Sequence, residues 1–443
     1  MTSSNVLTRT LGLPSLVLLG LAYMTPIIVL GIFGIVAEIT AGASASAYLV
    51  ALVAMVFTAS SYARLAAAYP VAGSAYTYVG KTVDSRVGFL VGWAVLLDYL
   101  FLPMVIWLIG ASYLNAQFPS VPNAVWVLAF IALTTFLNIL GIKVADRANF
   151  VLMAFQTLVL ILFVVFAILF IVGANGAGGL VNSSPFVGID ASFGAITAGA
   201  AVAAYCFLGF DAVTTFTEEA IDPRRTVPKA IMLVALLGGG IFVAVSYVTQ
   251  LVHPGGTFEN SGSAAFDIAG QIGGALFSAI FVAGLVVAQF TSGLAAQASA
   301  SRLIFAMGRD GVLPRRLFGS VNAKLKTPVT GIVVIGLVGL AALFLDITTS
   351  TSFINFGAFT AFTFVNIAVI AHFAREAKKG NKLNPLVYLV MPGIGAIVDA
   401  YLLMQLDSNA LTLGFWWLGI GVVALLIITR AFTRKPPVVM DAV

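Results

Sequence analysis

Charged residues are scarce in this sequence: Asp, Glu, Lys and Arg make up only 9% of its 443 residues, against about 25% in soluble domains. The single cysteine, Cys206, excludes an internal disulfide, and the lack of a CxxC motif or a Cys/His cluster gives no reason to expect a metal. Neither of the two histidines, His253 and His372, has a plausible nucleophile beside it. These absences point away from a soluble protein, a metalloprotein and an enzyme, and we expect no cofactor.

Apolar residues fill most of the sequence, which is 60% hydrophobic with a mean hydropathy of +1.07. A helix needs about 20 apolar residues to cross the hydrocarbon core of a bilayer. Runs of about that length occur at 15–40, 47–69, 86–114, 122–140, 150–173, 193–218, 229–252, 274–308, 327–346, 350–374, 386–405 and 410–431. They predict an all-α integral membrane protein with about twelve spans, the eighth continuing past the membrane.

Basic residues separate to one side of these spans. If the N-terminus is cytoplasmic, all 22 Lys and Arg residues fall in inner segments, and the outer loops carry only the acids Asp190, Glu259, Asp267, Asp346 and Asp407. This is the positive-inside pattern, so the net charge of +5 indicates orientation and not a nucleic-acid partner. We expect a multi-pass protein of the cytoplasmic membrane, surrounded by lipid, with both termini inside.

Two spans contain helix-breaking sequences. The first reads GLAYMTP over 20–26, where Pro26 removes a backbone donor and clashes with the preceding turn. The sixth reads CFLGFD over 206–211, a glycine among bulky residues followed by an acid. Broken helices in matching positions of two five-helix halves are typical of secondary transporters. The alternative is that Gly and Pro are simply common in membrane helices.

Asp98 in the third span and Asp211 in the sixth have no Lys or Arg available within the membrane, because all 22 are assigned to the inner side. A charged side chain there costs about 2.5–3.5 kcal/mol on insertion scales. Such acids are either protonated or paired with a cation from outside, and a diamine would supply two ammonium groups. The alternative is a protonated Asp that only bonds a neighbouring helix.

Aromatic residues also gather on the segments expected to face a central cavity: Tyr23, Tyr99, Phe207, Phe210, Phe356 and Phe359. The faces of such rings stabilise ammonium groups by cation–π contact. Ordinary packing is the competing interpretation for each ring, because the chain has 34 Phe residues.

Three inner-side motifs resemble the amino acid–polyamine–organocation superfamily. They are DPRRTVPKA at 222–230, YPVAGSAYTY at 69–78, in which Ser74 replaces the second glycine of the family's pattern, and SRLIFAMGRDGVLP at 301–314. Within the superfamily, four segments are most similar to bacterial putrescine importers: GLAYMTP at 20–26, LLDYLFLP at 96–103, FLGFDAVTT at 207–215 and INFGA at 354–358.

The resemblance implies a LeuT-like core of two inverted five-helix repeats, here 15–173 and 193–374, followed by two further helices at 386–431. It also implies alternating access and, usually, proton coupling. Amino-acid carriers of this family hold the substrate carboxylate on a glycine-rich break in the first span. Bulky residues and Pro26 occupy that place here, which favours an amine without a carboxylate. Some members carry a lysine in the fifth span, where this chain has only Gln156.

We therefore expect uptake of putrescine or a related short diamine, coupled to protons, with sodium as the alternative ion. Asp211 would bind one ammonium group or carry the coupling proton, and Asp98 would bind the second ammonium or a proton. The other expected substrate-binding residues are Tyr23, Met24, Thr25, Tyr99, Phe207, Gly209, Phe210, Gln289, Ser292, Asn355 and Phe356. Glu218 and Glu219 are expected either to gate the inner side or to be a solvated helix end.

Two other functions compete with this expectation. The cargo of such a transporter could instead be a cationic or neutral amino acid, which a competition panel would distinguish. A channel or a ligand sensor is a different class, but the sequence has no filter repeat, no charged ring and no soluble output domain.

Overall fold

The structure is a computed structural model that describes residues 9–70, 75–141, 146–217, 219–309, 313–322, 324–325, 327–434 and 436, except for the side chains of residues 146–150, 306 and 309. Within these residues the chain is helical, and the only β feature is an isolated bridge between Leu11 and Ala220. The α-helices are α1 Leu13–Met24, α2 Ile28–Gly31, α3 Phe33–Ile39, α4 Ser44–Ala68, α5 Ala75–Thr82, α6 Ser85–Gln117, α7 Asn123–Leu140, α8 Asp146–Asn175, α9 Ser184–Val187, α10 Phe193–Ala203, α11 Pro223–Val252, α12 Ala264–Arg309, α13 Arg315–Phe318, α14 Val329–Gly339, α15 Ile347–Lys378, α16 Met391–Met404 and α17 Ser408–Ile428.

Short 3₁₀ and π segments connect or extend these helices: η1 Ala177–Leu180, η2 Ala204–Phe207, η3 Asp211–Phe216, η4 Ser261–Ser263, η5 Leu340–Leu343 and the π-helical η6 Leu386–Val390. The segment 174–192 contains η1 and α9, and the segment 253–273 contains η4 and the start of α12.

Eleven helical segments in the described part of the chain are long and apolar enough to cross a membrane. They correspond to eleven of the twelve expected spans. The expected span at 327–346 is a shorter apolar helix, Val329–Leu343, whose last turn is the 3₁₀ segment η5. Its 15 residues extend over roughly 25 Å, against about 30 Å for the hydrocarbon core. The multi-pass all-α class is confirmed, while the count of twelve is not.

Both predicted helix breaks are present. α1 ends at Met24, Thr25 takes a left-handed conformation with φ 50°, and the helix resumes at Ile28 after Pro26. In the sixth span, α10 gives way to η2, Leu208 is extended, and Gly209 has φ +110° before η3 begins. Proline and a positive-φ glycine cannot continue an α-helix, so these residues set the positions of the breaks.

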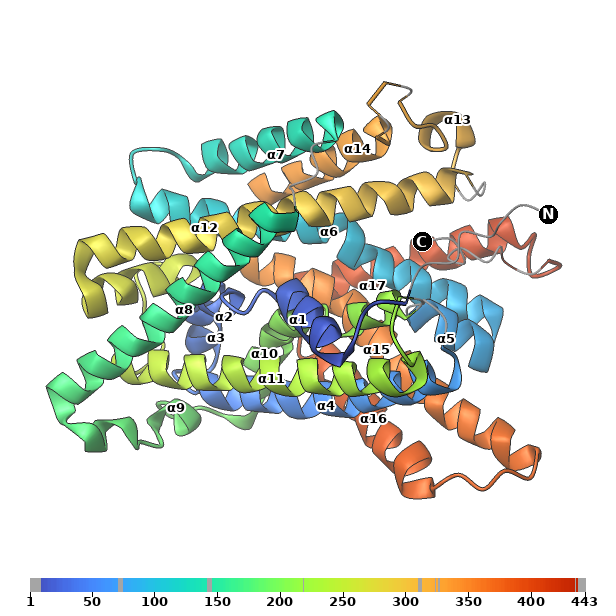
Figure 1. The fold of residues 1–443 in the computed structure, drawn as a ribbon, viewed down its shortest axis with the longest axis horizontal. Helices are drawn as coiled ribbons and strands as arrows, with labels where there is room; N and C mark the ends of the chain where they lie inside the picture. The colour runs from blue at the N-terminus through green and yellow to red at the C-terminus, as the bar shows by residue number, and fades with distance from the viewer. Residues whose placement is uncertain are drawn as a thin grey trace.

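The two broken spans pack against each other inside the helix bundle. A Cβ at Gly20 of α1 would lie 2.8 Å from a methyl of Val213 in η3, so the glycine permits a close approach. Figure 1 shows α4 and α11 running side by side along one edge, α7 and α14 along the opposite edge, and α12 crossing α6 between them. α16 and α17 pack on α15.

Basic helix ends meet on one side of the bundle. Arg86, at the start of α6, donates to the carbonyl of Phe432 beyond the end of α17 at 3.0 Å. Arg375, near the end of α15, donates to the carbonyl of Lys81 in α5 at 2.6 Å. The charge pattern predicted that these helix ends share a side, and these bonds join them.

Candidate functional site

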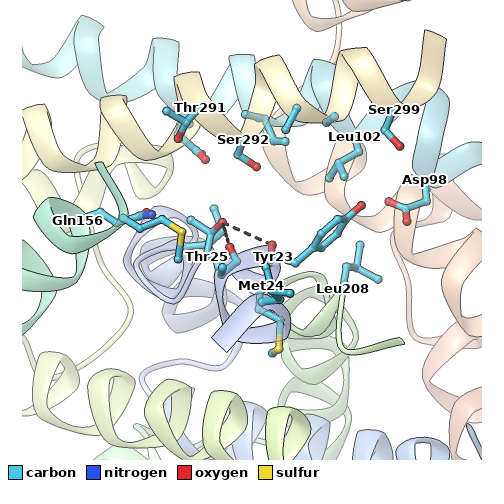
Figure 2. Close-up of a pocket in the computed structure, with 18 of the residues that line it drawn as sticks. Tyr23, Met24, Thr25, Asp98, Leu102, Gln156, Leu208, Thr291, Ser292 and Ser299 are labelled. Atoms are coloured by element: carbon cyan, nitrogen blue, oxygen red, sulfur yellow. Dashed lines mark hydrogen bonds between the residues drawn. The ribbon is translucent and has the colours of Figure 1, made fainter. Parts of the chain in front are cut away.

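A cavity of about 270 Å³ lies where α1, α6, α8 and α12 meet the broken sixth span. Its volume is near the lower end of the usual range for ligand pockets, so it suits a small molecule. Many of its wall residues are apolar, and the polar ones, several of which are labelled in Figure 2, are Tyr23, Thr25, Asp98, Gln156, Tyr205, Gln289, Thr291, Ser292 and Ser299.

A second cavity, of about 50 Å³, adjoins the first and shares Tyr23, Asp98 and Leu208 with it. Asp98 reaches it from α6, and Asp211 reaches it from the first residue of η3. The fold thus brings the two membrane acids singled out in the sequence to the walls of one small space. That space has room for about one or two water molecules, or for one ammonium group.

The ring of Tyr23 lies between the two cavities. It packs directly over Gly209, and a Cβ on that glycine would collide with the ring. In Figure 2 the Tyr23 hydroxyl points toward Asp98. The residue is 47% exposed although it lies deep in the protein, because it faces the cavity. The two helix breaks therefore form one site, in which a ring from the first covers the glycine of the second.

Neither acid has a basic partner among the residues that the structure describes. Oδ1 of Asp98 is buried and accepts no hydrogen bond there. Oδ2 of Asp211 accepts one long bond, 3.5 Å, from the hydroxyl of Tyr62 in α4. Two carboxyl groups that share a small cavity without a cation repel each other if both are ionised. The arrangement is therefore suited to a positively charged guest, a proton or both.

Neutral polar groups line other parts of the larger cavity. Gln156 comes from α8, and Gln289 and Ser292 come from α12. Within the described residues, Oε1 of Gln156 and Nε2 of Gln289 are buried and without a hydrogen-bond partner. A buried polar atom without a hydrogen bond is costly. Because both residues line the cavity, a ligand there could bond these two atoms. The cavity thus offers amide and hydroxyl groups in addition to its carboxyl groups.

Several other residues expected at the site lie outside the walls of both cavities. Phe207 packs against Phe242 of α11 with ring centroids 5.1 Å apart. Phe210 contacts Phe362 of α15 at 5.4 Å, and Phe356 faces α17. All three are fully buried.

Asn355 and Met24 also have partners away from the cavities. The Asn355 amide donates to the carbonyls of Ala201 and Val202 at 2.7 and 3.3 Å, which joins α15 to α10. Met24 belongs to the cavity wall, but its side chain turns away and packs on Gly238 of α11. By contrast, Tyr99 and Gly209 line the small cavity.

Glu219 acts here through its main chain. Its carbonyl oxygen accepts bonds from the amides of Thr10 and Leu11 at 2.9 and 3.0 Å, and Ile221 donates back to Leu11. The segment before α1 is therefore tied to the segment after the sixth span. No ion pair involving Glu219 is present among the described residues, and Glu218, the other expected gating residue, lies outside them.

Two polar residues of the folded structure were not singled out in the sequence: Tyr62, which reaches Asp211, and Asp399, which lies away from both cavities. Tyr62 lies in α4, an unbroken helix, so nothing in the local sequence indicates that it reaches Asp211. Asp399 lies near the end of the expected span 386–405, yet it is fully buried. An acid in an otherwise uncharged helix is the only signal for it, because its neighbours come from distant segments.

The profile of the family described as "Amino acid permease" matches residues 11–437. The chain is 37% identical over 445 residues to the low-affinity putrescine importer PlaP of Escherichia coli strain K12, which covers 98% of this chain and 97% of that protein. It is 29% identical over 345 residues to the branched-chain amino acid permease BcaP of Bacillus subtilis, covering 73% of this chain and 71% of the relative. It is 31% identical over 353 residues to mouse cationic amino acid transporter 4, covering 75% of this chain and 54% of that transporter.

Proposed function

The chain belongs to the amino acid permease family of the amino acid–polyamine–organocation superfamily, and on that basis we propose that it imports putrescine or a related short diamine across the bacterial cytoplasmic membrane by alternating access. The observation that carries the proposal is the pair of carboxyl groups, Asp98 and Asp211, on one small cavity without a basic partner among the described residues. The similarity to a putrescine importer over nearly the whole chain supports the same cargo.

One ammonium group of the diamine would occupy the small cavity between Asp98 and Asp211. At about 4 Å and an effective dielectric constant near 20, an ammonium and a carboxylate attract each other by about 4 kcal/mol. The Tyr23 ring borders the same space and adds cation–π stabilisation. Both acids then serve one ammonium group, whereas the sequence alone suggested one acid for each.

The second ammonium group would lie in the larger cavity. Oε1 of Gln156 is a free buried acceptor there, and the hydroxyl oxygens of Thr291 and Ser292 also accept hydrogen bonds. Apolar side chains such as Leu102 and Ile106 line the same cavity and would contact the methylene chain. This assignment predicts a preference for a diamine over a monoamine.

Two positions of the first helix break, Thr25 and Pro26, offer a substrate carboxylate no hydrogen-bond donor. The amide of Thr25 already donates to the carbonyls of Leu21 and Ala22, and Pro26 has no N–H. An amino acid would also bring its carboxylate toward Asp98 and Asp211, and like charges in such a site cost several kcal/mol. The amino acid permeases among the relatives make an amino acid the alternative cargo.

Coupling to protons is part of the proposal. Two acids on one cavity with a single cationic partner leave one carboxyl group available to carry a proton. Asp98 and Asp211 would then alternate between proton and substrate as the cavity changes sides. Uptake driven by a pH gradient and, separately, by a sodium gradient distinguishes the two coupling ions.

Uptake of labelled putrescine into proteoliposomes tests the function directly. Truncating one partner of a buried charge pair costs at least about 2 kcal/mol, so Asp211→Asn should weaken putrescine uptake by about 30-fold or more at low substrate. Asp190→Asn is the matched control, because Asp190 is exposed in a loop, lines neither cavity, and has a φ of 55° that also suits asparagine.

A competition panel then distinguishes the cargo classes. Putrescine and cadaverine should inhibit uptake more strongly than ornithine, lysine or leucine. The reverse order would contradict the diamine, and unchanged uptake by Asp211→Asn would contradict the role of the acid.

A further inference from the structure

A third carboxyl group is buried in the helix bundle, away from both cavities. Asp399 belongs to α16, which follows the ten spans expected to form the inverted repeats, and it is 0% exposed. It faces α4 and α15, and Gly395, one turn earlier, allows α16 to approach Asn366 of α15 closely. Asp399 lines neither of the two cavities.

Side chains from three helices form a hydrogen-bonded cluster around this acid. The hydroxyl of Thr58 and the amide of Asn366 both donate to Oδ2 of Asp399, at 2.7 and 2.9 Å. The hydroxyl of Ser61 donates to Oδ1 of Asn366 at 2.6 Å. Oδ1 of Asp399 is buried and has no partner within the described chain.

No described cation compensates a charge on Asp399. The titratable groups on the elements packed around it contact other partners: Tyr48 with Cys206, Tyr62 with Asp211, Arg64 with the Ser60 carbonyl and the Tyr388 ring, His372 with Tyr69, Arg375 with the Lys81 carbonyl, Glu376 with Lys379, and Tyr401 with Thr197. Lys378 is exposed at the end of α15. An anion buried without a cation is strongly disfavoured, so the neutral acid fits this environment.

The donors and acceptors of the cluster fit a proton better than a metal ion. Thr58 and Asn366 present hydrogen-bond donors to the carboxyl group, and the one amide oxygen nearby, that of Asn366, is occupied by Ser61. Sodium, like other hard cations, needs several oxygen ligands directed at one point. Within the described part of the chain, the carboxyl group has one unpaired oxygen, Oδ1, and a single oxygen can hold a proton.

The cluster is linked to the small cavity through adjacent residues. Ser61 precedes Tyr62, whose hydroxyl donates to Asp211. Asn366 also donates to the carbonyl of Phe362, which lines the small cavity and packs against the Tyr62 ring at 6.1 Å. A shift of α4 relative to α15 would therefore change both sites.

We propose that Asp399 is a proton-binding site, separate from the cavity acids, that is occupied on Oδ1 in this conformation and empties during the transport cycle. The carboxylate takes up one proton to become the neutral acid, and it releases that proton when movement of α4 and α15 opens the cluster to water. The proposal rests on the proposed transport function, because it adds a coupling site to it.

Asp399→Asn tests this site, because asparagine keeps the size and the neutral state but cannot exchange a proton. Putrescine counterflow, which needs no net proton movement, should stay within about twofold of wild type. The putrescine accumulation ratio that a pH gradient drives should fall about tenfold per unit of pH difference across the membrane, for each proton that is no longer coupled. Thr58→Val removes one donor to the same carboxyl group but leaves the acid, so proton coupling should persist, with a pH profile shifted toward higher pH because the charged form loses a hydrogen bond.

Infrared difference spectroscopy of the purified protein gives a reading that is independent of cargo. The wild-type spectrum minus the Asp399→Asn spectrum should contain a protonated-carboxyl band at neutral pH, because bands of Asp98 and Asp211 cancel in the difference. Absence of that difference band, or wild-type pH-driven accumulation by Asp399→Asn, would overturn the proposal. A wild-type protein that fails to exchange putrescine would instead contradict the proposed cargo, and the infrared comparison would still decide the state of Asp399.

Discussion

Replacing Gly209 with alanine perturbs the second helix break in two ways. Gly209 has φ +110°, a region that residues with a side chain rarely adopt, at a cost of order 1–3 kcal/mol. The added Cβ would also collide with the Tyr23 ring, which packs directly on the glycine. The ring would have to leave its place between the two cavities, where it borders both Asp98 and Asp211.

The backbone strain sets the size of the expected loss of putrescine affinity. A strain of 1–3 kcal/mol corresponds to about 5–150-fold in an equilibrium, so the apparent affinity for putrescine should fall within that range and thermal stability should also fall. Gly240→Ala is the matched control: it makes the same chemical change within α11, and nothing lies within 4 Å of its added Cβ. In a helix interior this change is stabilising by about 0.5–1 kcal/mol.

Two measurements check the prediction, putrescine-dependent uptake in proteoliposomes and thermal unfolding of the purified protein. Adding Tyr23→Ala to Gly209→Ala should restore part of the lost thermal stability, because the collision is removed while the backbone strain remains. If Gly209→Ala transports and unfolds like Gly240→Ala, then the contact between the two helix breaks is not the feature that shapes the site.

Two further predictions concern the cavity and the packing of the last helix. Gln156→Lys should weaken putrescine uptake about tenfold or more, because it places a like charge beside the proposed second ammonium site; uptake at wild-type affinity would remove Gln156 from that site. Trp417→Phe should lower the free energy of unfolding by about 0.5–1.5 kcal/mol, because Trp417 and Trp93 each donate an indole N–H to the other's carbonyl, at 2.8 and 2.9 Å. Transport by Trp417→Phe should persist, and an unchanged melting temperature would show that the reciprocal bonds do not hold α17 on α6.

Positions of the helix breaks could be predicted because they depend on local chemistry. Pro26 lacks an N–H and Gly209 lacks a Cβ, and each property acts on the backbone where the residue stands. The spans could be predicted for a similar reason, since apolar length is a property of consecutive residues. The short helix Val329–Leu343 is the exception, because its last residues are as apolar as a span but form a 3₁₀ turn.

Directions of side chains near the breaks could not be predicted. A broken helix loses its regular period, so the spacing of Tyr23, Phe207 and Phe210 does not tell which ring faces the cavity. The structure brings Tyr23 to both cavities and buries Phe207 and Phe210 against α11 and α15. Gln156 is a polar residue whose proposed role could not be predicted either, because it rests on the position of its side chain on the cavity wall and on an Oε1 without a partner among the described residues.

The amino-acid sequence alone predicts a multi-pass helical membrane protein, the breaks in its first and sixth spans, and the lack of a basic partner for Asp98 and Asp211 within the spans. These three features depend on composition and on the local chemistry of individual residues. Two groupings are seen only in the folded structure: the two acids share one small cavity, and Asp399 lies in a cluster with Thr58 and Asn366. Such groupings depend on helices far apart in the chain packing together, which no local pattern encodes.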